Sequence, residues 1–457
     1  MKRWDKIATI AGGVLFAAYL VCMVFFIVYK AQWTYGDDHQ FLVSTAIGEP
    51  IPSWIGTQPA IGRFWPLGQV DYDLLLWVPA EYKCVAHFLL SALSFVCLAL
   101  LTFWGVVAAL KEYKMPVRVW TGVLTAVMLC STVYYVFIYL VFAERIITVL
   151  IAACLVLLMM LRRTNQWGYA LGALLCAAYL IFCKEILFGC FAVLAGFMLL
   201  MDRNASRIQK ITWYGLLALA GIYIGIYMIC IYPQIEHIYN DERPKAEVFT
   251  IVWDLMGRMK IWYAVVVIAL IRCYALIAQK DRDHLLYDAF LLAGLVYMAG
   301  MAVLQFPFDY YYYPALTFVA VPTAYYLVYY CTAWGGIILL SAACYFAYQP
   351  LPNVIRDQIT HRTVTYPMME RYYDLHKAGY TLVWEEKNLT GWDLTLWSYH
   401  RFIHMQWINY LYGLSGTPVS FEFAQTPPTD GTPWVRFSFE RNDNIPIEQQ
   451  VQVTIMP

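Results

Sequence analysis

Eleven apolar segments, separated by short charged connectors, fill most of the first 348 residues of this chain. An α-helix of about 20 apolar residues crosses the hydrocarbon core of a bilayer, where backbone polar groups must be bonded within the protein. Only 14% of the residues are charged, whereas soluble domains carry about 25%. The sequence therefore predicts an all-α, polytopic membrane domain. The expected spans are residues 7–29, 85–110, 117–140, 145–161, 167–183, 186–201, 211–231, 261–279, 286–305, 314–331 and 334–348.

Basic residues indicate which side of the membrane each connector faces. Lys2, Arg3 and Lys6 precede the first segment, and the later basic clusters fall on the same side in the eleven-span arrangement. Cytoplasmic connectors carry an excess of Lys and Arg, so we expect a cytoplasmic N-terminus. The later clusters comprise Lys111, Lys114, Arg118, Arg162, Arg163, Arg203, Arg207, Lys210, Arg272, Lys280 and Arg282.

Three longer pieces fall on the expected outer side of the membrane. They are a first loop (30–84), a second loop (232–260) and the C-terminal segment 350–457. The C-terminal segment has ordinary charge, a helix-like polar stretch near 356–377, and alternating runs such as Val435–Phe439 that are typical of strands. We therefore predict a transmembrane domain over 1–349 and a small extracytoplasmic α+β domain over 350–457.

Charge and cysteine usage exclude several kinds of function. The net charge is zero, which gives no case for a nucleic-acid partner. All 12 cysteines fall between Cys22 and Cys344, and no two are spaced as C-x-x-C. The sequence therefore predicts neither a disulfide framework nor a zinc site. His400 and His404 share a helical face at a spacing of four, but no acidic residue stands at helical spacing to them, so we predict no metal there.

An acidic pair, Asp37 and Asp38, lies just past the first apolar segment on the expected outer side. A carboxylate beside a membrane-bound substrate can act as general base toward a hydroxyl. Two adjacent acids also disfavour each other's ionisation, which raises the pKa of one of them. A solvated turn after a helix has the same Gly-Asp-Asp composition, so both interpretations stand at this point.

Lys184 and Glu185 interrupt an apolar run, Tyr179–Phe188, at the expected outer boundary of the membrane. Ionisable residues within membrane segments are costly, and by default they indicate function. A lysine there can bind phosphate as a point charge. The alternative is a Lys–Glu pair that snorkels to the interface. Positive charge on the outer side runs against the topology rule, so we favour the functional role.

Other cations and phenols lie on the same expected side. Each cation alone suits an anchor in the lipid headgroups, but together they could form a basic rim for a lipid-linked phosphate. The tyrosines before Pro314 suit an aromatic belt, or phenols that hydrogen-bond phosphate or sugar. The residues concerned are Arg63, Arg145, Arg258, Lys260, Asp309, Tyr310, Tyr311, Tyr312 and Tyr313.

Taken in order along the chain, these positions resemble the GT-C glycosyltransferases, polytopic enzymes that take sugars from polyprenyl-phosphate donors. The protein O-mannosyltransferases and the lipid A aminoarabinose transferases are similar families, and the layout also resembles bacterial O-antigen glucosyltransferases. The resemblance covers about 1–330. Asp309 departs from it, because the family often has a basic residue there. The matched landmarks are Gly36-Asp37-Asp38-His39-Gln40-Phe41, Glu144-Arg145, Lys184-Glu185 and Tyr311-Tyr312-Tyr313-Pro314-Ala315-Leu316.

The resemblance implies a role for each candidate residue in an inverting sugar transfer. Asp37 would be the general base, and Asp38 would support it or bind the acceptor. The donor phosphate would lie near Lys184, Arg63, Arg145, Arg258, Lys260, Tyr311 and Tyr312. Substrate support would come from Glu144, Glu185, His39, Asp309, Glu236 and His237.

The same resemblance implies the partners and the location of the protein. We expect a polyprenyl-phosphate sugar as donor, and a surface glycan such as lipopolysaccharide O-antigen, or another lipid-linked acceptor, held by the C-terminal domain and the second loop. We expect a monomer in the bacterial inner membrane with no required cofactor; a divalent metal has no support in the sequence.

Two other functions remain as alternatives. A polysaccharide polymerase or ligase would use a diphosphate-linked glycan and depend on outer-loop Arg and His residues. A transporter or flippase would need polar residues at mid-membrane. The candidate ionisable residues of this chain lie instead near the expected outer boundary, which favours an interfacial enzyme.

Overall fold

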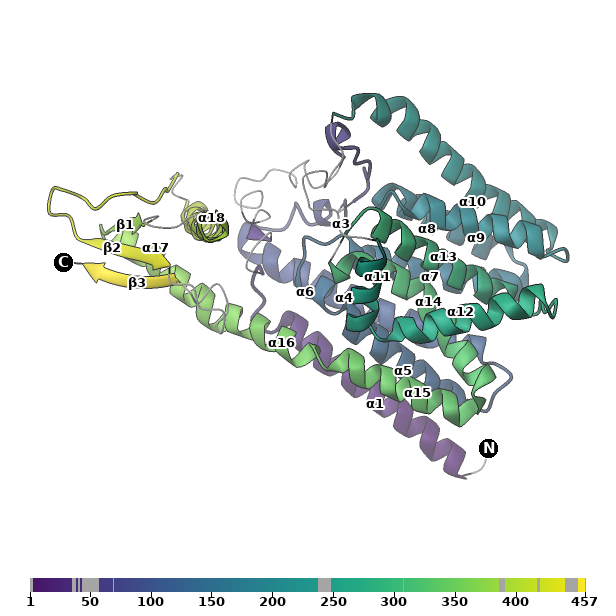
Figure 1. Cartoon of the computed structure of the whole chain (residues 1–457). Coiled ribbons are helices and arrows are strands. Elements are labelled where there is room, and N and C mark those ends of the chain that lie inside the picture. Colours follow the sequence, from purple (N-terminus) through teal and green to yellow (C-terminus); the bar gives the residue numbers. More distant parts are fainter. Residues whose placement is uncertain are drawn as a thin grey trace.

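The computed structural model describes residues 3–34, 38–39, 42, 57–68, 70–236, 248–306, 308–385, 391–416, 420–439 and 451–456. Two predicted site residues, Asp37 and His237, lie outside this described part of the chain. The described part is mostly helical, with one small sheet at the C-terminal end (Figure 1).

Each of the eleven predicted segments coincides with a helix. The bundle consists of α1 (Arg3–Val28), α4 (Ala80–Ala109), α5 (Met115–Val133), α6 (Tyr135–Ile138), α7 (Glu144–Thr164), α8 (Trp167–Cys183), α9 (Leu187–Met201), α10 (Arg207–Ile226), α11 (Val248–Arg258), α12 (Ile261–Ile277), α13 (Leu285–Val303), α14 (Tyr313–Tyr330) and α15 (Thr332–Tyr348). Short helical turns η2 (Pro59–Ile61), α3 (Val70–Asp73), η3 (Tyr227–Ile231), η4 (Tyr232–Gln234) and η5 (Asp309–Tyr312) lie in the connections.

The described residues include seven helices that are long and apolar enough to cross a membrane. The number is eight if α11 and α12, which meet at 114°, form one broken span. The chain is therefore a multi-pass membrane protein by the length and composition of its helices. The count of eleven crossings, and the side on which each connector lies, stay predictions.

Helix α14 occupies the centre of the bundle. All of its residues from Tyr313 to Val328 are buried, and it packs against α13, α15, α7, α5 and α4. Gly294 of α13 makes one of these contacts possible, because a Cβ there would lie 2.9 Å from the Ala315 carbonyl oxygen and closer still to Val319. Small residues allow helix backbones to approach in this way within membranes.

A long helical rod leads from the bundle to the sheet (Figure 1). It covers Thr332–Lys377, 46 residues, as α15, α16 (Leu351–Thr360), the π-helical turn η6 (His361–Thr365) and α17 (Tyr366–Lys377). The helix predicted near 356–377 is thus confirmed. The predicted domain boundary at residue 350 falls inside this rod, and the division into two domains stays a prediction.

The sheet has three strands in the order β1-β2-β3. These are β1 (Thr381–Trp384), β2 (Trp434–Phe439) and β3 (Val451–Met456), and β2 confirms the predicted strand at Val435–Phe439. β1 and β2 are parallel, β2 and β3 are antiparallel, and α18 (Gly391–Leu414) belongs to the connection from β1 to β2. Trp384 packs between Trp397 of α18 and Phe437 of β2, so the sheet and α18 share one aromatic core.

Candidate functional site

The predicted site residues that the structure describes gather at one end of the bundle, where α1 ends, α7 and α14 begin, and residues 57–68 lie. We call it the loop end. Asp38 lies here with 1% of its surface exposed. Its carboxylate accepts three backbone N–H groups: from Thr34 at 3.2 Å, Leu140 at 3.1 Å and Val141 at 3.0 Å. Asp38 therefore holds the first loop against the turn between α6 and α7.

That turn leads directly into a buried ion pair. Glu144 is at the start of α7, and its Oε1 lies 2.6 Å from Nζ of Lys184, which follows the last residue of α8. Lys184 is 5% exposed, and its ammonium also lies 4.6 Å from the ring centre of Tyr311 and 5.2 Å from that of Trp65. Lys184 is thus enclosed by a carboxylate and two aromatic faces, which stabilise a desolvated cation.

Residues 57–68 cover this pair from the first loop. Glu185 accepts the Phe64 N–H at 3.1 Å, and Tyr223 donates to the Phe64 carbonyl at 2.9 Å. The guanidinium of Arg63 lies 4.6 Å from the centre of the Trp65 ring, the same ring that Lys184 contacts. The structure therefore brings the predicted residues Arg63, Lys184 and Glu185 together.

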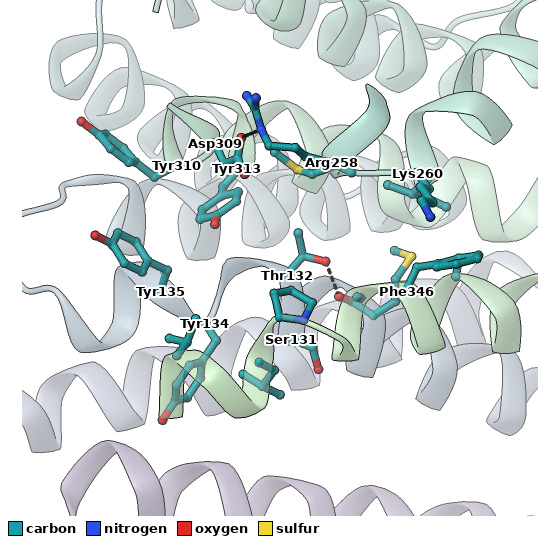
Figure 2. Close-up of a pocket in the computed structure, with 18 of the residues that line it drawn as sticks. Ser131, Thr132, Tyr134, Tyr135, Arg258, Lys260, Asp309, Tyr310, Tyr313 and Phe346 are labelled. Carbon is teal, nitrogen blue, oxygen red and sulfur yellow. Dashed lines mark hydrogen bonds and ion pairs between the residues drawn. The ribbon is translucent and has the colours of Figure 1, made fainter. Parts of the chain in front are cut away.

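A pocket of about 480 Å³ also lies at the loop end. Figure 2 shows the side chains that line it. Its lining comes from η5 and from the loop-end parts of α5, α6, α11, α12, α14, α15 and α16. Arg258 donates from Nε to Asp309 Oδ1 at 2.7 Å, and Lys260 lies 4.2 Å from the ring centre of Phe346. The ion pair is 45% and 37% exposed, so a ligand can reach both charges. The remaining polar lining consists of Ser131, Thr132, Tyr134, Tyr135, Tyr310 and Tyr313.

Aromatic contacts join the pocket to the buried pair. The ring of Tyr310, on the pocket wall, lies 4.3 Å from that of Tyr311, which in turn faces the Lys184 ammonium. Tyr310 also packs at 4.1 Å on Phe142, next to the turn that Asp38 holds. The pocket, the ion pair and the first loop are therefore one continuous assembly.

The departure at Asp309 has a local explanation. The GT-C families that the sequence resembles often have a cation at this position, and here a carboxylate is paired with Arg258 from α11. The positive charge is therefore supplied from another helix at the same end of the pocket. The sequence could not reveal this, because 51 residues separate the two partners.

Four other candidates lie elsewhere in the loop end. Arg145 is buried in the first turn of α7. Tyr312 donates to the Phe306 carbonyl at 2.8 Å, and His39 lies 3.2 Å from the Tyr366 hydroxyl. Glu236 is exposed, and its backbone N–H donates to Ala60 at 2.9 Å.

Sequence reasoning did not select Lys83 and His87, which are both buried in α4 at a spacing of four. The His87 ring packs 5.4 Å from Trp33 of the first loop. A signal was present, since two basic residues on one helical face flank the start of the apolar segment predicted from residue 85. Lys83 lies just before the predicted segment and His87 just inside it, so the two residues were not considered together.

The loop end thus combines an apolar-walled pocket, exposed cations, phenols and buried carboxylates. Such a set can hold an amphiphile with an anionic group, because apolar walls take the chain and Arg and Lys take the charge. No protein-family model and no curated protein matches this chain.

Proposed function

We propose that the protein is an inverting, membrane-embedded glycosyltransferase of the GT-C type that uses a polyprenyl-phosphate sugar. The pocket of about 480 Å³ beside the Lys184–Glu144 pair carries the proposal. A polyprenyl-phosphate sugar has an apolar tail, a phosphate and a sugar. The pocket offers an apolar wall for the tail, Arg258 and Lys260 for the phosphate, and tyrosine hydroxyls for the sugar.

In the proposed reaction, Asp37 removes the proton from an acceptor hydroxyl. The hydroxyl oxygen attacks the anomeric carbon, the bond from that carbon to the phosphate oxygen breaks, and the lipid phosphate leaves with the bonding electrons. Fixed cations stabilise the charge that develops on the leaving group, and such stabilisation is commonly the largest contribution to catalysis. Asp38 already accepts three backbone N–H groups, which suits a supporting role beside the base.

The position of the pocket distinguishes this proposal from a transporter. A transport path would pass through the bundle and meet polar groups at mid-membrane. The lining residues of this pocket instead belong to the loop-end parts of seven helices, to η5 and to the residues that join them. A site at one end of the bundle suits transfer between a lipid-linked donor and an acceptor outside the bilayer.

The test uses the purified full chain in lipid nanodiscs with a panel of polyprenyl-phosphate sugars and a surface-glycan acceptor. Formation of free lipid phosphate together with glycosylated acceptor is the expected result. Asp37→Asn should abolish most of it, whereas Asp254→Asn, an exposed acid on α11, is the matched control. Turnover of diphosphate-linked glycans alone would replace the proposal with a polymerase or ligase. Equal turnover in wild type and Asp37→Asn would remove Asp37 as the base.

A further inference from the structure

We infer that Arg362 and Tyr366, two residues of the C-terminal rod, position the first-loop segment that carries the acidic pair. The inference rests on the proposed function, because it assigns a task to residues that would not touch substrate. The sequence analysis predicted that the region after residue 350 binds the acceptor. The inference gives two residues of this region a different role, which is to position the first loop.

Arg362 fixes the end of α1. Its Nη1 donates to two backbone carbonyls there, Phe26 at 3.1 Å and Tyr29 at 2.7 Å. Helix C-termini leave such carbonyls without partners inside the helix, and they carry partial negative charge. The guanidinium also lies 4.6 Å from the ring centre of Phe88 in α4. Arg362 therefore joins the rod, the end of α1 and the start of α4.

Tyr366 fixes the segment that follows. Its hydroxyl donates to the Trp33 carbonyl and lies 3.2 Å from Nε2 of His39. The Tyr366 and His39 rings are stacked, with centres 5.8 Å apart, and Trp407 of α18 packs on Tyr366 at 4.5 Å. Trp33 and His39 stand on either side of the acidic pair in sequence, so one tyrosine contacts both flanks.

The other side of the segment is held by the bundle. Asp38 accepts the N–H groups of Leu140 and Val141, and the Thr34 hydroxyl donates to the Ile138 carbonyl. The described residues on both sides of Asp37, namely Trp33, Thr34, Asp38 and His39, are therefore held between the α6–α7 turn and the rod, and we call this set of contacts the clamp. Removing the rod's contacts should loosen it without disturbing the contacts on the bundle side.

The local geometry of the rod explains how one helix presents both residues to the loop. Residues His361–Thr365 form a π-helical turn, which has more than four residues per turn. Arg362 and Tyr366 are four residues apart and both direct their polar groups at the first loop. Single π-turns are often found at functional sites, where they redirect side chains.

A native thiol reports on the clamp. Cys84 of α4 is 6% exposed and lies beside the Trp33 backbone, close enough to Arg362 and Asp38 for both charges to act on its sulfur. All twelve cysteines are free thiols, so Cys84 needs no engineering. Loosening of the segment should admit a water-soluble maleimide to Cys84, because labelling of a buried group follows the population of the open state.

The experiment compares Tyr366→Phe and Arg362→Gln with two control variants from the same rod. Tyr345→Phe makes the same chemical change at an exposed tyrosine of α15, and Arg356→Gln changes an exposed arginine of α16. Labelling of each cysteine is followed by peptide mass spectrometry in nanodiscs. Transfer from the lipid-linked donor is measured on the same samples.

Cys84 labelling should become about fivefold faster in Tyr366→Phe, which loses the neutral contacts of the hydroxyl with Trp33 and His39, and at least about tenfold faster in Arg362→Gln, which loses charge-assisted hydrogen bonds. The kcat should fall by similar factors while the donor KM stays unchanged, because the pocket is not altered. Arg362→Lys should recover part of both effects, since it keeps a charged donor.

Unchanged Cys84 labelling and unchanged kcat in both variants would overturn the inference, even if wild-type transfer is found. Faster labelling of Cys84 together with Cys130, Cys154 and Cys190 would also overturn it, because it would indicate general unfolding. Selective labelling of Cys84 with no transfer from any donor in wild type would keep the clamp and reject the proposed function.

Discussion

The two ends of the bundle each contain a buried ion pair, and the pairs differ in how completely they are bonded. Away from the loop end, Arg272 of α12 forms two hydrogen bonds with Asp288 at 2.8 and 2.9 Å, and a third with Asp281 at 2.7 Å. Tyr326 donates to Asp288 as well, at 2.6 Å. At the loop end, Lys184 meets one carboxylate oxygen and two ring faces among the described residues.

This difference separates a structural pair from a candidate binding site. A buried pair is stable when hydrogen bonds satisfy its remaining donors and acceptors, as they do around Arg272. The Lys184 ammonium has three donors and lies behind the aromatic wall of a pocket that holds further cations. The loop end therefore has donors for an incoming anion, whereas the opposite pair is already saturated.

The strongest test of the comparison is Asp37, the proposed general base. Asp37→Asn should lower kcat by about 10²–10⁴-fold, which is the usual contribution of general base catalysis. The substitution keeps the shape of the side chain, so donor affinity and the free energy of unfolding should not change. Asp38→Asn should lower kcat less. If Asp37→Asn turns over at the wild-type rate and Asp38→Asn is inactive, then Asp38 is the base and Asp37 the supporting residue.

A substitution in the ion pair at the opposite end should change the stability of the protein and not its activity. Arg272→Gln leaves Asp288 buried without its main partner and should lower the free energy of unfolding by about 3–5 kcal/mol, measured in denaturant. Transfer per folded molecule should stay at the wild-type level. Arg203→Gln, at an exposed position, is the control and should change neither quantity. A change in donor affinity in Arg272→Gln would show that the two ends do not differ in this way.

Lys184 tests the binding role directly. Lys184→Ala should weaken donor binding by ~1.5–3 kcal/mol if the ammonium bonds the phosphate, and Lys184→Arg should recover part of the loss. Binding is measured by titration of a donor analogue into nanodiscs, with the exposed Lys210→Ala as control. Unchanged donor affinity in Lys184→Ala would show that the Lys184–Glu144 pair has only a structural role, like the Arg272–Asp288 pair.

The smallest effect should come from histidines next to the clamp. Burial, with added repulsion from His400 and His39, lowers the pKa of His404 to about 3, and burial lowers that of His400 to about 4. Because the unfolded chain binds protons near pH 6.5 and the folded chain does not, stability should fall as pH drops below 6.5. The loss should be about 1–2 kcal/mol between pH 6.5 and 5.5. In the double variant His400→Gln/His404→Phe, unfolding curves should show that the free energy of unfolding no longer falls by this amount between pH 6.5 and 5.5. An unchanged pH dependence would show that these two histidines do not cause it.

Sequence reasoning was sufficient where a pattern repeats along the chain. Hydrophobic runs located the long helices of the bundle, but the 11-residue α11 lies in the range 232–260 that was predicted as a loop. The order of polar landmarks anticipated that Asp38, Glu144 and Lys184 would lie at one end. Contacts between distant polar residues carry no such pattern. Tyr366 bonds Trp33 across 333 residues, and nothing in the polar stretch that contains it indicates a partner in the first loop.

Counting charges did not reveal how Arg272 is paired. The residue was counted with Lys280 and Arg282 as a cation near the end of the predicted segment 261–279, and it lies inside α12 with 2% exposure. Its acidic partner Asp288 is on the next helix. A rule that counts basic residues along the sequence takes no account of an acidic partner that the fold brings close. Pairing decides burial, and pairing depends on the fold.

The rod Thr332–Lys377 has a thermodynamic consequence. One helical element lines the loop-end pocket through Phe346 and Leu351, contacts the first loop through Tyr366, and leads into the sheet at its far end. If the sheet binds the acceptor, both substrates act on the same element, and any change in donor affinity caused by the acceptor must be matched by an equal change in acceptor affinity caused by the donor. Synergy between the two substrates would then be measurable from either side, by titrating one at fixed concentrations of the other.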